Sequence, residues 1–462
     1  MNETLYRIET DSLGEIKVDS SKYWGAQTQR SLEHFSIGKD IMPKELIAAY
    51  SVVKLASARA NNELGKLKAD KLALIEKAAL EVLEGKLDSH FPLHVWQTGS
   101  GTQTNMNLNE VISNRANELA GSKLGTKSPI HPNNDVNMSQ SSNDTFPTAM
   151  HISAFTAVQK RLLPVLQELL SAFEAKQKEF SDIIKIGRTH LQDAVPITFG
   201  QEFSGYSKQI SNSIENIKEI SKKLLPLPIG GSAVGTGLNT HKEFARTVVS
   251  QINKITSFEF VPADNKFCYM AAHDDFALLS GGLKTLACAM IKIANDIRWL
   301  ASGPSCGIGE ITIPSNEPGS SIMPGKVNPT QCEAMTMVCA QVMGYDTAIS
   351  FACSQGNFEL NVYKPLIIYD TLESIRLLSD CCESFSKFLV KGIEVNEKKV
   401  RYFIGKSYML ATALNEVIGY DNAAKIAKYA YHQDISLKEA AMDLKLVSES
   451  DFDRVVDVSK MV

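Results

Sequence analysis

Residues 279–300 read LSGGLKTLACAMIKIANDIRWL, and apolar side chains recur along this stretch at alternating spacings of four and three residues. The residues of this stripe are Leu279, Leu283, Leu286, Met290, Ile293, Ile297 and Leu300. Such a period is typical of a helix that packs along one continuous apolar seam. The predicted helix is about 33 Å long at about 1.5 Å per residue, and far longer than the usual mean of about 11–12 residues.

The same spacing recurs in three other stretches of the chain. Their apolar positions are Leu162, Leu166, Leu169 and Phe173; Ile210, Ile214 and Ile217; and Met335, Val338, Val342, Tyr345 and Ile349. Four or five long helices with such seams pack as an elongated bundle, which predicts a mainly α fold. Further copies of the chain would bury any seam that one chain cannot cover, so we expect a homo-oligomer.

The segments on either side of these seams differ in composition. The first 45 residues mix turn signals with a strand-like IKV at 16–18, residues 46–85 are helical in pattern, and residues 86–150 are polar with few long apolar stripes. Charge returns at NEKKVR (396–401), and shorter helical patterns follow it. We predict an N-terminal mixed domain (1–140), a central long-helix bundle (141–395) and a small helical C-terminal domain (396–462).

The composition is that of a soluble globular protein, with 44% hydrophobic and 22% charged residues among 462. A net charge of −4 argues against nucleic-acid binding, which needs clustered Lys and Arg. No apolar run approaches the roughly 18–20 residues of a membrane span, and the polar start resembles no targeting signal. We expect a cytoplasmic protein with neither a nucleic-acid nor a membrane partner.

Cysteine and histidine spacings predict no metal site. All eight cysteines follow residue 267 without a C-x-x-C pair, so we expect buried free thiols rather than disulfides or an iron–sulfur cluster. Pro92 separates His90 from His94, which excludes a helical ligand pair. We interpret the isolated histidines as ordinary polar residues and expect no cofactor; they are His34, His151, His241, His273 and His432.

Five islands rich in glycine and short polar side chains interrupt the helical background. They are TGSGTQTNMNLNEV (98–111), HPNNDVNMSQSSND (131–144), GRTHLQDAVP (187–196), GGSAVGTGLN (230–239) and EPGSSIMPGKVNPTQCEA (317–334). Any one of them could be a loop with helix caps, but together they offer backbone N–H groups and compact dipoles for binding a small anion. The island at 230–239 has neither a dinucleotide-binding nor a P-loop register. In the last island we expect Lys326 to be a buried cation.

With these motifs, the chain resembles the class II fumarases of the aspartase/fumarase superfamily. GSSIMPGKVNP (319–329) matches the superfamily's signature loop, while GRTHLQDA and TQCEA narrow the match to fumarases. Close aspartase relatives typically carry glutamine where His190 stands here. The resemblance extends from ETDSLGEIKV (9–18) to GYDNAAKIAK (419–428). It implies a three-domain fold and a homotetramer whose active sites each draw on three subunits.

The resemblance also implies an activity, the reversible hydration of fumarate to malate through an aci-carboxylate carbanion, without metal or cofactor. Ser320 would take the carbon-bound proton, and His190 paired with Glu333 would handle the proton of water. Lys326 and Asn328 would stabilise the carbanion's charge. The other residues expected to bind the small dicarboxylate are Ser100, Thr102, Ser141, Ser142, Asn143, Thr189 and Ser321.

A second anion site of the family corresponds to His131, Asn133 and Asn134. Relatives usually carry aspartate at the last position, so the asparagine here should alter how His131 titrates. The family also commonly has arginine where this chain has Ser305, and nothing in the sequence explains that loss.

Three alternatives stay open at this point. The first is an ammonia-lyase such as aspartase, the second is a non-catalytic structural protein on the same scaffold, and the third is an iron–sulfur fumarase, which would be brown and oxygen-sensitive. A structural protein need not keep the set His190, Ser320, Lys326 and Glu333, which this chain has.

Overall fold

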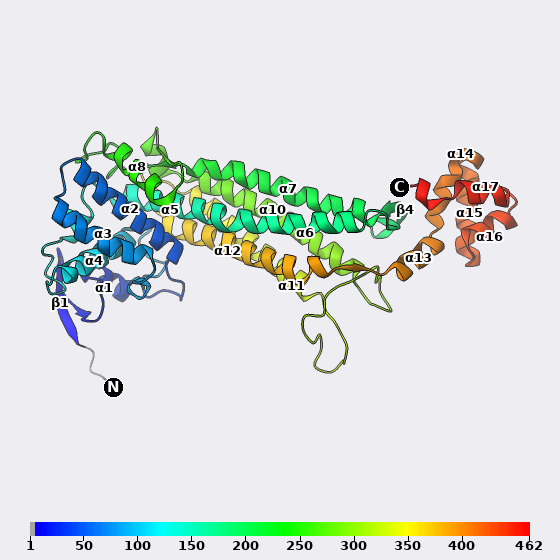
Figure 1. Ribbon diagram of the computed structural model, residues 1–462, viewed down its shortest axis with the longest axis horizontal. Helices are drawn as coiled ribbons and strands as arrows, with labels where there is room; N and C mark the ends of the chain where they lie inside the picture. Colours follow the sequence, from blue (N-terminus) through cyan, green and yellow to red (C-terminus); the bar gives the residue numbers. More distant parts are fainter. Residues whose placement is uncertain (1–4) are drawn as a thin grey trace. The chain divides into compact units, whose positions relative to one another are not determined.

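The computed structural model describes residues 5–462, which form a mainly α-helical protein, as the apolar seams predict (Figure 1). The chain divides into two compact units. Unit 1 comprises Met1–Pro164, Glu215–Thr285 and Ala340–Ser379. Unit 2 comprises Val165–Ile214, Leu286–Cys339 and Asp380–Val462. The three-domain division drawn from the sequence stays a prediction.

Five long helices contribute residues to both units. They are α6 (Leu163–Glu179), α7 (Phe199–Ser221), α10 (Asp274–Leu300), α11 (Thr330–Cys353) and α12 (Lys364–Phe388). α10 contains the whole predicted stripe, and every residue of that stripe is at most 5% exposed. By length and composition α10 would also pass for a membrane span, but 56% of its most apolar stretch is buried inside the protein, as in a core helix.

Unit 1 is built around α2 (Lys44–Glu63), which packs against α3 (Ala69–Leu83), α5 (Ser142–Ala157) and α8 (Phe244–Thr256). Its other helices are α1 (Ala26–His34), α4 (Thr102–Leu119) and α9 (Lys266–Ala271), with short turns η1 (Asp88–His90), η2 (Pro132–Val136), η3 (Val158–Leu162) and η4 (Lys222–Leu224). An antiparallel hairpin, β1 (Tyr6–Asp11) and β2 (Gly14–Asp19), confirms the strand expected at 16–18. β5 (Pro226–Leu227) and β6 (Val261–Pro262) pair in parallel.

The polar stretches 98–111 and 131–144 lie at the starts of helices. Most of the first is in α4, and the second leads into α5. These helices are buried although they lack long apolar stripes. Their polar side chains form hydrogen bonds inside the protein, so a hydrophobic pattern could not reveal them.

Unit 2 contains the hairpin of β3 (Ile184–Thr189) and β4 (Gln192–Thr198), and a second pairing of β7 (Ile311–Thr312) with β8 (Glu394–Val395). The helices of its C-terminal part are α13 (Glu397–Lys406), α14 (Asn415–Ile418), α15 (Tyr420–Gln433), α16 (Leu437–Asp443) and α17 (Glu449–Val455), with short turns η5 (Val390–Gly392), η6 (Tyr408–Leu414) and η7 (Val458–Lys460). A cluster that includes Leu414, Ile426, Ala430 and Phe452 forms their core.

The cysteines are all free, but their burial differs from the expectation. Cys332, Cys339 and Cys382 are buried, as we predicted. The prediction is wrong for three others, because Cys268, Cys288 and Cys306 are exposed in the single chain. Within residues 5–462, no three His, Cys, Asp or Glu side chains gather closely enough to hold a metal ion.

Two of the histidines interpreted as ordinary polar residues are in the core of unit 1. The Nδ1 atom of His151 lies 3.1 Å from the Leu224 carbonyl oxygen, and its ring contacts Tyr269 and Phe276 edge to face. Burial lowers the pKa of His151 to about 4. His273 is also buried, and burial with the nearby Lys364 ammonium holds its pKa well below the ordinary value.

These histidines make stability depend on pH. The unfolded chain takes up a proton on His151 near pH 6.5, whereas the folded protein resists protonation until about pH 4. Folding stability is therefore lost as pH falls through this window, by about 3 kcal/mol for this residue. Between pH 7 and pH 4.5, we expect the melting temperature of a His151→Gln variant to fall by less than that of the unmodified protein.

The change of melting temperature with pH has to be compared between variants, because buried carboxyls affect it in the opposite direction. One of these is Asp370, whose pKa is raised by burial to about 7. A His432→Gln variant is the control, since His432 is exposed on α15. Equal slopes for His151→Gln and the unmodified protein would contradict the assignment.

Candidate functional site

Three of the predicted substrate-binding hydroxyls lie together in unit 1. Ser100 and Thr102 stand at the start of α4, and their side-chain oxygens are 2.8 Å apart. The Thr102 oxygen lies 2.7 Å from that of Ser142, in the first turn of α5. Each hydroxyl can donate as well as accept, so the chain of three can reorient its protons toward an anion. The structure thus joins two islands that are about 40 residues apart in the sequence.

The adjacent residues Ser141 and Asn143 belong to the same site. The Ser141 hydroxyl caps α5 by accepting from the Asn143 N–H, and the Asp144 carboxylate accepts from the Ser141 N–H at 3.0 Å, which completes a capping box. The Asn143 side-chain amide donates to the Ala233 carbonyl at 2.7 Å and so contacts the island at 230–239. The N-terminus of α5, with its positive dipole end, therefore lies beside these polar side chains.

Gly99 fixes this group of hydroxyls against the start of α12. Its carbonyl accepts from the Lys364 N–H at 3.1 Å, and a Cβ atom at Gly99 would lie 1.4 Å from the Val362 carbonyl oxygen. Only glycine permits this close approach, and the hydrogen bond from Lys364 holds the backbone directly before Ser100.

In unit 2, Thr189 and His190 lie at the tip of the β3–β4 hairpin. The two-residue turn consists of His190 (φ +57°) and Leu191 (φ +59°), and both side chains are exposed. Two positive φ angles define a type I′ turn, which strongly favours Asn-Gly. Left-handed backbone costs a non-glycine residue about 1–2 kcal/mol, so this turn is strained where the imidazole projects.

A buried ion pair supports the hairpin just before its tip. The Arg188 guanidinium donates two hydrogen bonds to Glu310, at 2.7 and 2.9 Å. Glu310 is fully buried and also lies 3.5 Å from the Lys185 ammonium, which holds the strand from a second point. Bidentate pairs of this kind fix orientation as well as charge. The hairpin is therefore held firmly two residues before His190.

The signature island forms a loop between α10 and α11, visible as the long excursion before α11 in Figure 1. The Gly319 N–H donates to the Lys326 carbonyl at 2.9 Å, and the Asn328 amide donates to the Gly319 carbonyl at 2.6 Å. A Cβ at Gly319 would lie 2.3 Å from the Lys326 carbonyl oxygen. These contacts close the loop at a narrow neck.

Inside this loop, the Ser320 hydroxyl oxygen accepts from the N–H groups of Ile322 and Met323, at 3.2 and 3.0 Å. Two N–H donors on one oxygen favour negative charge on that oxygen. The expectation of a buried Lys326 is wrong for the single chain, because residues 321–327 are all exposed. The ammonium group lies on a projecting loop rather than in the core.

Glu333 lies in the first turn of α11 and is exposed. In the described part of the chain, no hydrogen bond or ion pair joins it to His190, so their pairing stays a prediction. Unit 1 carries Ser100, Thr102, Ser141, Ser142 and Asn143. Unit 2 carries Thr189, His190, Ser320, Ser321, Lys326, Asn328 and Glu333.

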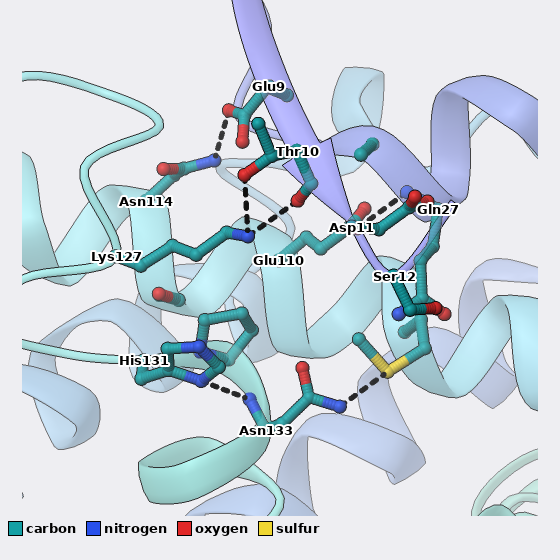
Figure 2. Close-up of a pocket in the computed structure, with 14 residues that line it drawn as sticks. Glu9, Thr10, Asp11, Ser12, Gln27, Glu110, Asn114, Lys127, His131 and Asn133 are labelled. Atoms are coloured by element: carbon teal, nitrogen blue, oxygen red, sulfur yellow. Dashed lines mark hydrogen bonds between the residues drawn. The ribbon is translucent and has the colours of Figure 1, made fainter. Parts of the chain in front are cut away.

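Two residues of the predicted second anion site line a pocket of about 270 Å³ in unit 1 (Figure 2). His131 and Asn133 face the pocket together with Lys127, whose ammonium donates to the carbonyl and hydroxyl oxygens of Thr10. Asn134 is not among the lining residues. Its N–H and that of Asn133 donate to the His131 Nδ1 atom, at 3.2 and 3.1 Å.

These bonds determine the protonation state of His131. Because Nδ1 accepts two hydrogen bonds, the proton of the neutral ring is on Nε2. Burial, and then the Lys127 ammonium, lower the pKa of His131. The ring is therefore a neutral donor near pH 7 rather than a cation.

Three carboxylates also line this pocket, and each is already bonded. Glu9 pairs with Arg7, and Asp11 with Arg30. Glu110 accepts from the N–H groups of Gly25, Gln27 and Thr28. The pocket's acids thus have internal partners, and Lys127 and His131 supply its donors.

Comparisons with known proteins agree with this geometry. A family described as "Lyase" matches residues 14–344, and one described as "Fumarase C C-terminus" matches residues 410–462. Fumarate hydratase class II of Helicobacter pylori is 59% identical to this chain over 99% of both proteins. The chain belongs to the class II fumarase family.

Solved structures of this family share the whole fold. The crystal structure of class II fumarase from Schistosoma mansoni matches with a TM-score of 0.97 and 43% identity over 99% of both chains. The cobalt-bound structure titled fumarate lyase:delta crystallin from Brucella melitensis matches with a TM-score of 0.95 and 40% identity, again over 99% of each chain.

Two buried charged residues beneath the unit 1 hydroxyls were missed from the sequence. They are Lys54 on α2 and Asp144 on α5, and both are completely buried. The capping-box spacing from Ser141 to Asp144 was a usable signal for the second. Lys54 could have been noticed as a lone lysine among the apolar residues SVVKLA (51–56).

Proposed function

We propose that this protein catalyses the reversible hydration of fumarate to malate through an aci-carboxylate carbanion. The observation that carries the proposal is the full-length match to class II fumarases in a chain that has the motifs around His190 and Ser320–Lys326. The geometry supports it with neutral hydroxyl donors in unit 1 and a cationic loop in unit 2. Neutral donors suit a dicarboxylate because they bind its carboxylates through hydrogen bonds without placing a full positive charge beside them.

The difficult step is removal of a proton from the carbon beside a carboxylate. Ser320 is the proposed base, and the N–H groups of Ile322 and Met323 stabilise its alkoxide. The negative charge that then develops on the substrate carboxylate is stabilised by the Lys326 ammonium and the Asn328 amide. Ser321 and the unit 1 residues Ser100, Thr102, Ser141, Ser142 and Asn143 hold the two carboxylates.

In the second step of malate dehydration, the carbanion's electron pair forms the C=C bond and the C–O bond at the neighbouring carbon breaks. The departing hydroxide takes a proton to leave as water; hydration of fumarate runs the same step in reverse. His190 is the proposed acid–base group, with Thr189 beside it binding substrate. Glu333 would orient the imidazole and raise its basicity through one ring nitrogen. All of these steps use side chains of the protein, so the proposed reaction needs neither a metal nor a cofactor.

We further propose that the enzyme is a cytoplasmic homotetramer whose active sites draw on three subunits. This assembly accounts for the exposure of His190, Lys326 and Glu333 in the single chain, because neighbouring subunits would cover them. The pocket of His131 and Asn133 is the proposed second anion site, and Asn134 contributes to it through the hydrogen bond of its N–H to His131 Nδ1. Lys127 supplies its positive charge in place of a protonated histidine.

The reaction is tested by which product accumulates. Purified protein in a chelator-containing buffer should convert fumarate to malate, and the yield of malate should be unchanged by added ammonium. Dominant aspartate would instead identify an ammonia-lyase. No product under either condition would favour the non-catalytic structural alternative.

A His190→Asn variant should separate catalysis from stability. The expected kcat falls at least about 10²-fold, the usual contribution of a general acid–base group, with little change in substrate affinity. Its melting temperature should stay equal or rise, because asparagine tolerates the left-handed turn better than histidine.

The matched control is Leu191→Asn, which relieves the other strained residue of the same turn. It should raise the melting temperature while kcat stays near the original value. Normal turnover by His190→Asn would remove His190 from the mechanism.

Lys326→Met should weaken both binding and turnover, because the methionine keeps the length of the side chain without its charge. We expect kcat/KM to fall by at least about 10²-fold. Lys391→Met, which removes another exposed lysine of unit 2, should leave the kinetics unchanged. Near-normal kinetics of Lys326→Met would exclude the proposed role of this residue in stabilising the carboxylate.

A further inference from the structure

Lys54 is a completely buried lysine that has no carboxylate in hydrogen-bond contact among residues 5–462. Its ammonium donates to three side-chain amide oxygens, those of Asn105 at 2.7 Å and of Asn137 and Gln140 at 3.0 Å each. Lysine is almost never fully buried unless it is paired, because desolvating its charge is costly. The three bonds use all its protons, so the surroundings are built for the charged form.

The three acceptors belong to the two segments that carry the substrate-binding hydroxyls of unit 1. Asn105 lies on α4 one turn after Thr102, and Gln140 directly precedes Ser141. A second set of bonds runs through Tyr50, whose hydroxyl donates to Asn105 at 2.9 Å and lies 2.6 Å from the Thr145 hydroxyl. The Thr145 hydroxyl donates in turn to the Ser141 carbonyl at 2.7 Å. The ammonium thus connects both segments.

The ionisable groups that face Lys54 are few. The Tyr50 ring lies 5.4 Å from the ammonium, in a cation–π arrangement. Asp144 is buried and interacts electrostatically with it, while its own oxygens accept from the N–H groups of Ser141, Gly230 and Ser232. Burial lowers the pKa of Lys54 to about 7 and raises that of Asp144 to about 6.

We propose that Lys54 is a positioning residue for dicarboxylate binding. Its hydrogen bonds hold the Thr102 turn and the Ser141–Asn143 segment at fixed positions relative to each other. Its charge also favours an anion at the hydroxyls. This inference rests on the proposed function, because Lys54 would act by supporting the proposed substrate-binding site. Lys54 does not touch the substrate in this scheme, so it affects affinity more than the chemical step.

The test is the binding of succinate, an unreactive four-carbon dicarboxylate, measured by calorimetry from pH 6 to pH 8.5. For the unmodified protein, the Kd should rise above about pH 7 as Lys54 loses its proton. At pH 6.5 the Kd of Lys54→Met should be about 10-fold higher than that of the unmodified protein. The Kd of this variant should also no longer rise above about pH 7. KM for fumarate should increase in parallel, with a smaller change in kcat.

The matched control is Lys176→Met, which removes another buried lysine whose ammonium donates to the Ile393 carbonyl at 2.8 Å in unit 2. It should lower the melting temperature without altering succinate binding. If Lys54→Met also changes only the melting temperature, Lys54 is merely structural and the proposal is wrong.

Asn105→Leu provides a second variant in case Lys54→Met does not fold. It keeps the lysine but removes one acceptor that favours the charged ammonium. Lys54 should then lose its proton at lower pH, and the rise in Kd should begin at lower pH. An unchanged pH profile would overturn the proposal. Failure of the unmodified protein to hydrate fumarate would instead overturn the proposed function, so the two failures are distinguishable.

Discussion

The polar side chains of α4 are buried along most of the helix, and each therefore needs a hydrogen-bond partner inside the protein. Asn117 exchanges two bonds with the backbone of Ile130, and Glu110 accepts from the backbone at 25–28. Asn105 accepts from Lys54 in the same way. Because these partners come from distant parts of the sequence, α4 orders the loops around it. The bond to Asn105 lies one turn after Thr102, so it helps to fix the proposed substrate-binding hydroxyls at the start of α4.

In unit 2, His190 is positioned in a different way, by a strained turn at the end of a firmly held strand. The ion pair of Arg188 with buried Glu310 fixes β3, and the turn that follows adopts left-handed backbone at His190 and Leu191. Relieving the strain at the first turn position would need another residue in place of His190, and the imidazole would be lost. Strain of this kind is found at functional sites, where the surrounding structure outweighs its cost.

The sequence predicted much of the fold because apolar periodicity is a direct record of burial. The stripe from Leu279 to Leu300 is an example, since it lies entirely within α10. The helices α4 and α5 were not predicted as buried elements, because their buried residues mix apolar side chains with polar ones that form hydrogen bonds inside the protein. Lys326 was expected to be buried, yet its loop is exposed in the single chain, because glycines, prolines and short polar residues form a projecting loop as readily as a buried one.

The candidate residues themselves came from short motifs and family resemblance. Periodicity carried no information about them, because hydroxyls such as those of Ser100 and Ser142 meet only through folding. Lys54 was overlooked for a similar reason, since its partners are three amides from two segments that lie more than 50 residues away in the sequence.

Gly99 and Gly319 show another kind of constraint. At each position a methyl group would overlap a backbone carbonyl, that of Val362 or that of Lys326. At these two sites the fold therefore requires an empty volume rather than a functional group. A search for enzyme residues that looks only for reactive side chains would pass over both.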